Sequence, residues 1–166
     1  LTRLNLDSID ILFIHDPDDH YEEALTQAYP TIAELKSQGV IKAIGVGMNQ
    51  WEMLAKFAKE ADFDCFLLAG RYTLLDHSAL DEFMPLCLEK NIGVIIGGPY
   101  NSGVLASDLK TETTYFYEPA PDDIVTKTRA IKEICERYQV PLKAVALQFG
   151  LKHPAVISTI PGPRNS

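Results

Sequence analysis

The chain has 166 residues, of which 46% are hydrophobic and 23% charged, and its formal net charge is −8 at pH 7. This composition is typical of a single globular domain and not of a disordered chain. The negative balance disfavours a nucleic-acid partner or an anionic membrane surface, because both are bound through clustered cations. No apolar run approaches the roughly 20 residues of a membrane-spanning helix, and the opening residues do not resemble a signal peptide.

The cysteines indicate the redox environment of the protein. Cys65, Cys87 and Cys135 lie far apart in apolar contexts. An odd number of separated cysteines favours buried free thiols in a reducing compartment, and their spacing is not that of a zinc site. We therefore expect a cytoplasmic protein.

Five short apolar segments recur along the chain and are predicted to be strands. They are rich in Ile, Val, Leu and Phe, and most lack strict alternation of apolar and polar positions. This pattern is typical of strands that are buried on both faces of a parallel sheet. The predicted strands are residues 9–14, 41–46, 66–69, 94–96 and 156–160.

Helical patterns separate these strands. Apolar residues at three- and four-residue steps predict a helix over residues 21–39, with a kink or a new start at Pro30 and a stop at Gly39. A second helix is expected after a capping Asn49, and a third is expected to begin at Ser78. Two further helices precede the last strand.

The order β-α-β-α-β-α-β-α-α-β predicts parallel β-α-β crossovers, which fit either a doubly wound open sheet or a (β/α)8 barrel. No G-x-G-x-x-G motif follows any predicted strand, which lowers the expectation of a nucleotide-binding open sheet. Five strands cannot close a barrel of eight, and such barrels typically need about 250 residues. If the fold is a barrel, this chain is a part of one. In either architecture, ligands bind at the carboxyl ends of the strands.

The first predicted strand ends on His15, which opens a polar loop. An imidazole at a strand end can donate a hydrogen bond to a carbonyl oxygen or titrate near neutral pH, so His15 is the leading catalytic candidate. A satisfied core histidine is the alternative. A metal site of His15, Asp16, Asp18 and His20 is disfavoured, because one strand end is too compact to aim all four side chains at an ion.

Two later loops carry candidate binding residues. The segment "GGPYNSG" at residues 97–103 allows a ligand to approach the backbone closely, although a tight turn would explain it equally well. After the last strand, "PGPRNS" offers Arg164, which could stack on or pair with a nucleotide, or could merely be exposed.

A long connection over residues 105–123 suggests a lid or binding loop. Its aromatic residues are Tyr115, Phe116 and Tyr117. They are expected to cover a substrate, and pinning of the loop to the core is the alternative. Arg71 and Tyr72, after the third strand, face either the pocket or the interior.

Four ordered segments together resemble the aldo-keto reductase superfamily. They are "LDSIDILFIHDP", "LKSQGVIKAIGVGMN", "RYTLLDHSALDEFMPLCLEKNIGVIIGGPYNSGVLA" and "VISTIPGPRN". The resemblance implies an α/β fold, a (β/α)8 TIM barrel. Residues 1–166 would form a single partial domain covering about strands four to eight, without strands one to three or the C-terminal helix. "IHDP", "YNSGVLA" and "IPGPRN" look most like the bacterial D-threo-aldose and L-fucose dehydrogenases, with pyridoxal 4-dehydrogenase as a near relative.

The resemblance implies an oxidoreductase that transfers a hydride between a nicotinamide cofactor and a sugar or aldehyde carbonyl, without metal. The family uses an Asp, a Tyr, a Lys and a His, and His15 matches the histidine. The other three residues belong to strand units that this sequence lacks, so the 166 residues alone are expected to be inactive. Tyr115 and Tyr117 are the expected substrate contacts.

The resemblance also assigns cofactor contacts. Asn49 resembles the asparagine that holds the nicotinamide carboxamide, although the usual "GVSN" is "GVGMN" here. Gly97 stands where the family often places a tyrosine that stacks on the nicotinamide. The loop over the pyrophosphate is matched by Tyr100, Asn101, Ser102 and Gly103, and the loop around the adenosine by Pro161, Gly162 and Arg164. No lysine accompanies Arg164, which favours NAD over NADP.

These expectations converge on an NAD(P)-dependent aldose 1-dehydrogenase. A non-catalytic homologue that binds nucleotide, as a sensor or an accessory subunit, is the alternative from another functional class. An unrelated β/α lyase or a metal-assisted hydrolase is a further alternative. The identity of the sugar and the oligomeric state are left open by the sequence.

Overall fold

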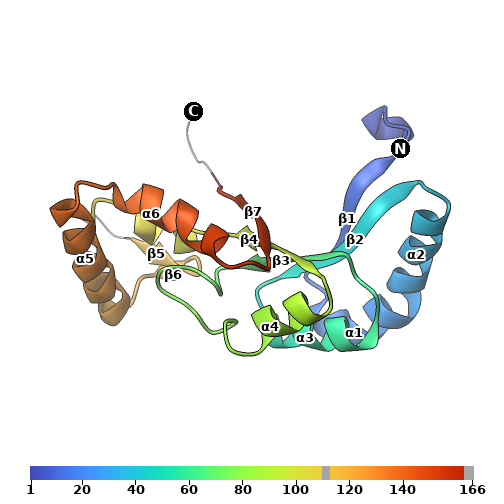
Figure 1. Ribbon diagram of the computed structural model, residues 1–166, viewed down its shortest axis with the longest axis horizontal. Coiled ribbons are helices and arrows are strands. Elements are labelled where there is room, and N and C mark those ends of the chain that lie inside the picture. Colours follow the sequence, from blue (N-terminus) through green and yellow to red (C-terminus); the bar gives the residue numbers. More distant parts are fainter. Residues whose placement is uncertain (110–112, 163–166) are drawn as a thin grey trace.

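All five predicted strands are present in the computed structural model, which describes residues 1–109 and 113–162. They form one sheet in the order β1-β2-β3-β4-β7, and every neighbouring pair is parallel. Successive strands lie side by side, as expected for repeated β-α-β crossovers, so their carboxyl ends share one edge of the sheet (Figure 1). The strands are β1 Ile9–His15, β2 Ile41–Met48, β3 Cys65–Ala69, β4 Gly93–Gly97 and β7 Val156–Ile160.

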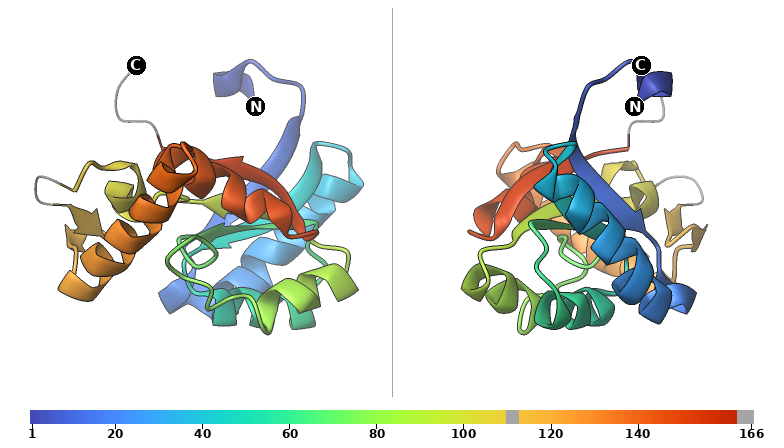
Figure 2. Two further views of the ribbon diagram at one scale, coloured as in Figure 1. Left: turned by 60° about the vertical axis from the view of Figure 1, so that its left-hand side comes forward. Right: turned by 90° about the vertical axis from the view of Figure 1, so that its right-hand side faces the viewer.

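The helices divide into two groups. Figure 1 shows α3 and α4 beneath the strands and α2 beside β2, whereas α5, α6 and a small hairpin lie at the other end of the molecule. The left view of Figure 2 again shows α5 and the hairpin at one end. The longer helices are α2 Tyr29–Ser37, α3 Trp51–Glu60, α4 Phe83–Glu89, α5 Asp122–Arg137 and α6 Leu142–Phe149. The short elements are η1 Thr2–Leu4, η2 Asp18–His20, α1 Tyr21–Glu23, η3 Ala24–Ala28, η4 Asn101–Ala106 and η5 Gly150–Lys152. Strands β5 Thr114–Tyr115 and β6 Glu118–Pro119 form the antiparallel hairpin, which the sequence analysis did not predict.

One face of the sheet is covered by helices and holds the main hydrophobic core. Alternate residues of each strand point to this face, as the pleat requires. Strand residues Ile44, Val46, Met48, Phe66, Leu68, Val94 and Ile96 pack there with helix residues Leu54, Phe57, Phe83 and Met84, and all of them are at most 1% exposed. A second, smaller cluster lies between η4, α5 and α6 and contains Val104, Leu105, Cys135, Leu142 and Ala146.

The predicted new start at Pro30 is confirmed in the first helical segment. The structure runs from α1 through a π-helical turn, Ala24–Ala28, into α2, with Pro30 in the first turn of α2. A π turn widens the helix just where the proline ring would otherwise strike the preceding turn, so the chain continues. The predicted stop at Gly39 is confirmed, because this glycine has a φ of 74° after the last turn.

Two predicted helix starts are wrong. The N-cap of α3 is Gln50, whereas Asn49 donates its side-chain Nδ2 to the carbonyl of Ala69 at 3.2 Å. Helix α4 begins at Phe83 and not at Ser78, because Ser78 donates both its backbone N–H and its hydroxyl to Asp76 Oδ1. The side chains of Asn49 and Ser78 therefore do not cap helices. Asn49 makes a tertiary hydrogen bond, and Ser78 makes hydrogen bonds within a turn. Among the residues described, no helix is long and apolar enough to cross a membrane.

Candidate functional site

Hydrogen bonds join the carboxyl ends of four strands into one continuous rim. The backbone N–H of Asp16 donates to the carbonyl of Gly47 at 2.9 Å, which links the ends of β1 and β2. Asn49 links β2 to β3 through its 3.2 Å bond to Ala69, and Gly70 links β3 to β4 through a 3.0 Å bond to Gly97. The predicted site residues from four strands are therefore held at the same edge.

His15 lies at the end of β1 with its side chain 83% exposed, so the alternative of a buried core histidine is wrong. Its Nε2 is 3.5 Å from Oδ2 of Asp16, whose backbone has a φ of 44°. A non-glycine residue in this left-handed region stores strain, which is common where a side chain must be aimed at a ligand. An open hollow of about 410 Å³ lies beside His15 and Asp16 and is also lined by Pro17 and His20.

The glycine-rich loop after β4 turns through left-handed backbone at four positions, Gly98, Asn101, Ser102 and Gly103. Asn101 is only 4% exposed and donates its Nδ2 to the carbonyl of Gly70 at 3.2 Å, so its side chain fixes the loop to the end of β3. Tyr100 is half-buried against the second hydrophobic cluster. Gly103 leaves open space beside the backbone of this loop, because no atom lies within 4 Å of the position of a Cβ on this residue.

The remaining predicted cofactor positions differ in their surroundings. Gly97 is buried, and a Cβ there would lie 2.9 Å from Cδ2 of Leu67, so no aromatic ring fits at this position without a shift of Leu67. Pro161 and Gly162 follow β7 and are exposed, with open space around Gly162. Arg164 lies outside the described residues.

The aromatic residues of the long loop have separate roles. Tyr115 is half-buried against the second cluster, and burial, followed by the charge of Asp76, raises its pKa. Phe116 is also half-buried, whereas Tyr117 is 86% exposed. Tyr115 and Phe116 thus pin the hairpin, as the alternative held, and Tyr117 is the ring that stays available to a ligand.

The sequence left open whether Arg71 faces the pocket or the interior, and it predicted no partner for this residue. Its guanidinium lies 4.3 Å from the centroid of the Phe116 ring, and its Nη1 donates to Oδ2 of Asp76 at 3.2 Å. Burial tends to raise the pKa of Asp76, but hydrogen bonds from Ser78 and the charge of Arg71 outweigh it and hold the pKa below the usual value. The only sequence signal was the position of Arg71 two residues after a strand.

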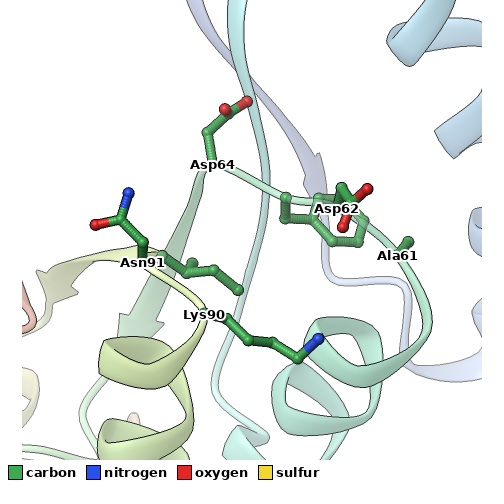
Figure 3. Close-up of a pocket in the computed structure, with 7 residues that line it drawn as sticks. Ala61, Asp62, Asp64, Lys90 and Asn91 are labelled. Atoms are coloured by element: carbon green, nitrogen blue, oxygen red, sulfur yellow. The ribbon is translucent and has the colours of Figure 1, made fainter.

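A larger hollow lies at the opposite edge of the sheet. It measures about 560 Å³ and is lined by polar residues that precede β3 and β4, among them Asp62, Asp64, Lys90 and Asn91 (Figure 3). Asp64 accepts two 2.6 Å bonds from Lys36 Nζ and one of 2.8 Å from the backbone N–H of Ile44. These bonds join α2 and β2 to the start of β3, whereas ligands of parallel β/α folds bind at the carboxyl edge.

The described part of the chain contains no group of three or more His, Cys, Asp or Glu side chains placed to hold a metal ion. His20 contacts Glu23 at 3.3 Å and not His15. All three cysteines are buried free thiols, as predicted. Burial raises the pKa of Cys65 to about 11 and that of Cys87 to about 12, which makes both poor nucleophiles at neutral pH.

Comparisons with known proteins show what the chain is similar to. The model of the aldo/keto reductase family matches residues 1–166. Pyridoxal 4-dehydrogenase of Microbacterium luteolum is 40% identical over 98% of this chain and 51% of its own length, and D-threo-aldose 1-dehydrogenase of a Pseudomonas species is 40% identical over 96% of this chain and 49% of its own. The chain thus spans about half the length of these relatives.

A solved structure extends the likeness to the fold. The apo form of an aldo-keto reductase from Bacillus halodurans superimposes with a TM-score of 0.75 and is 25% identical, over 99% of this chain and 55% of that one. The parallel sheet therefore matches about half of an aldo-keto reductase barrel. The family model covers every residue of the sequence, and on that ground the chain belongs to the aldo/keto reductase family.

Proposed function

We propose that this chain supplies strands four to eight of a (β/α)8 barrel, and that the parent protein is an NAD(P)-dependent aldose 1-dehydrogenase. The single observation that carries the proposal is the exposed imidazole of His15 at the carboxyl end of β1, on the rim that also holds Asn49 and the glycine-rich loop. Two relatives at 40% identity are, by their names, a pyridoxal 4-dehydrogenase and a D-threo-aldose 1-dehydrogenase, which supports the proposal.

Membership of the family implies a nicotinamide cofactor, and the rim offers suitable contacts for one. The backbone around Gly103 and Gly162 is open, so a phosphate or ribose could approach both turns closely. The amide of Asn49, held at the rim by Ala69, suits the carboxamide of a nicotinamide ring. The bound cofactor would supply or accept the hydride. We favour NAD over NADP, as the sequence analysis does.

The role of His15 follows from its position. An exposed imidazole at a strand end can donate a hydrogen bond from Nε2 to the oxygen of the reacting carbon, which orients this oxygen and stabilises the charge that develops on it. The carboxylate of Asp16 lies 3.5 Å from this same Nε2, so the substrate oxygen would replace it as the partner of the imidazole. Proton transfer itself belongs to the tyrosine that the family places in an earlier strand unit.

The test is kinetic and uses the full-length parent. His15→Ala is expected to lower kcat/KM for an aldose about 10²- to 10⁴-fold, the range for loss of a positioned acid–base group, while the Kd values for NADH and NADPH stay within about twofold. His153→Asn is the matched control, because this histidine precedes the amino end of β7, at the edge of the sheet opposite to His15, and should leave turnover unchanged.

Turnover that is unaffected by His15→Ala would remove the imidazole from the mechanism. A panel of aldoses and pyridoxal assigns the substrate, and fluorescence titration with NADH and NADPH assigns the cofactor. Tight nucleotide binding without turnover of any carbonyl or sugar would instead favour the non-catalytic homologue.

A further inference from the structure

The hairpin of β5 and β6 is closed by a two-residue loop whose backbone is strained. Tyr115 pairs with Glu118, so only Phe116 and Tyr117 connect the strands. Their φ angles are 48° and 67°. Two consecutive positive φ values are the requirement of a tight type I′ hairpin turn, which normally selects Asn-Gly. Bulky aromatic residues adopt this backbone only when other contacts compensate the strain.

Compensating contacts come from two parts of the rim. Ser102, in the glycine-rich loop, accepts a 3.1 Å bond at its hydroxyl from the backbone N–H of Tyr117, and its carbonyl accepts a 2.9 Å bond from the hydroxyl of Thr114. Arg71, after β3, lies 4.3 Å from the centroid of the Phe116 ring. The hairpin is therefore fastened to both the β3 and the β4 ends of the sheet.

Gly70 makes room for the Phe116 ring. A Cβ on Gly70 would stand 3.2 Å from Cε1 of Phe116, and the glycine has a φ of 72°. Because Gly70 has no side chain, the Phe116 ring packs directly against its backbone. The guanidinium of Arg71 lies over the face of this ring. An arginine stacked on an aromatic face gains both cation–π attraction and contact area.

Arg71 itself stands on a rigid turn. Its Nη1 is held by Asp76, which is fixed by two bonds from Ser78. The hydroxyl of Thr73, a residue only 1% exposed, accepts bonds from the backbone N–H groups of Leu75 and Asp76. This network keeps the guanidinium in one place, so the position of Phe116 is set by β3 and not by the hairpin itself.

We propose that Arg71 is a positioning residue that clasps Phe116, thereby holding the hairpin over the carboxyl ends of β3 and β4 and setting where Tyr117 meets the substrate. This inference rests on the proposed function for its substrate, but the clasp can be measured without any substrate. Arg71 touches neither the cofactor nor the reacting atoms in this account.

The first arm of the test measures hydrogen–deuterium exchange at the backbone amides of residues 113–118 in the full-length parent. Arg71→Lys keeps the positive charge but loses the planar stack, and Phe116→Leu keeps an apolar side chain but loses the ring. Each is expected to speed exchange in the hairpin about fivefold to tenfold, as loss of one partly buried cation–π contact allows. Arg137→Lys, the same change at the end of α5, is the matched control and should leave the hairpin unchanged.

The second arm is kinetic. Arg71→Lys and Phe116→Leu should raise KM for the aldose about fivefold to tenfold, with kcat and the Kd for NADH within about twofold. The double variant should be no worse than either single one, because both substitutions remove the same contact. A merely structural role would lower kcat and thermal stability without this selective change in KM.

The outcomes separate the clasp from the proposed function. Unchanged exchange in both single variants, or additive effects in the double variant, would overturn the clasp. Faster exchange with an unchanged KM in an active parent would overturn the positioning of substrate. A parent without any carbonyl or sugar turnover would overturn the proposed function, and the exchange arm would then support or overturn the clasp by itself.

Discussion

The two faces of the sheet differ sharply in how they are packed. On the helix-covered face, strand residues such as Ile96 and Phe66 are at most 1% exposed and interlock with α3 and α4. On the opposite face, which we call the open face, Ile11 is 40% exposed and Ile160 is 50% exposed. Its centre holds Gly45, Gly47 and Gly97 beside the larger side chain of Leu67.

This difference shows where the present chain obtains its stability. Burial of apolar surface contributes about 25 cal/mol per Å², so the covered face supplies most of the favourable free energy. The open face carries apolar residues that remain in contact with solvent, which is the pattern of a surface that another part of a barrel covers. Comparison of matched substitutions on the two faces tests this interpretation directly.

The largest effect is expected from shortening an isoleucine. Ile96→Ala on the covered face should lower the free energy of unfolding by about 2–5 kcal/mol, because it removes buried methyl groups and leaves a cavity. Ile11→Ala on the open face removes the same atoms from a partly solvated position and should cost less than about 1 kcal/mol. Urea unfolding followed by circular dichroism measures both. Equal losses would mean that the open face is packed in solution.

A smaller effect separates two glycines within the open face. A Cβ on Gly45 would stand 2.3 Å from the carbonyl oxygen of Cys65 and 2.8 Å from Cε1 of Phe13, whereas on Gly47 the nearest atom is Cβ of Leu67 at 3.5 Å. Gly45→Ala should therefore destabilise the fold by about 1–3 kcal/mol through forced backbone shifts. Gly47→Ala should change stability by less than about 0.5 kcal/mol. If Gly45→Ala unfolds at the wild-type urea concentration, the open face is looser than the structure indicates.

The smallest expected effect is a pH dependence at the segment that leads into β7. Burial lowers the pKa of His153, whose Nδ1 accepts a 3.2 Å bond from the backbone N–H of Ala155. The unfolded chain then binds this proton at a higher pH than the folded chain. The stabilisation is complete above the unfolded pKa of about 6.5 and is lost as the pH falls towards the lower folded pKa.

His153→Asn retains a hydrogen-bond acceptor and removes the titration. The variant should lose less stability than the wild type between pH 7 and pH 5, measured by thermal unfolding at each pH. Parallel curves for the two proteins would show that His153 contributes nothing to the acid sensitivity.

The sequence predicted the sheet well because the strand signal is local. All five strands lie within two residues of their predicted ends, since runs of Ile, Val and Leu bounded by turns specify buried parallel strands. The hairpin was missed because "YFYE" contains no Asn-Gly, Asp-Gly or Gly-Gly. Its turn depends on Arg71 and Ser102, which lie 45 and 14 residues before Phe116 in the chain.

In the candidate site, too, local sequence patterns predicted some features, and contacts distant in the chain decided others. His15 was selected by its place at the end of an apolar run, and the structure leaves its side chain 83% exposed at that end. Asn101, assigned to the cofactor by resemblance, has its side chain turned inward to bond Gly70. No local pattern distinguishes an asparagine that faces a ligand from one that fastens a loop, because the difference lies in the partner atom.

The sequence by itself determined the strand order along the chain, the parallel crossovers and the family. These follow from hydrophobic periodicity and from motifs that are contiguous in the chain. Only the tertiary structure decided which face of the sheet is covered, which loops are tied to each other at the rim, and which polar side chains bond inward. Those properties depend on atoms that are distant in sequence and are brought within 3–4 Å only when the sheet has formed.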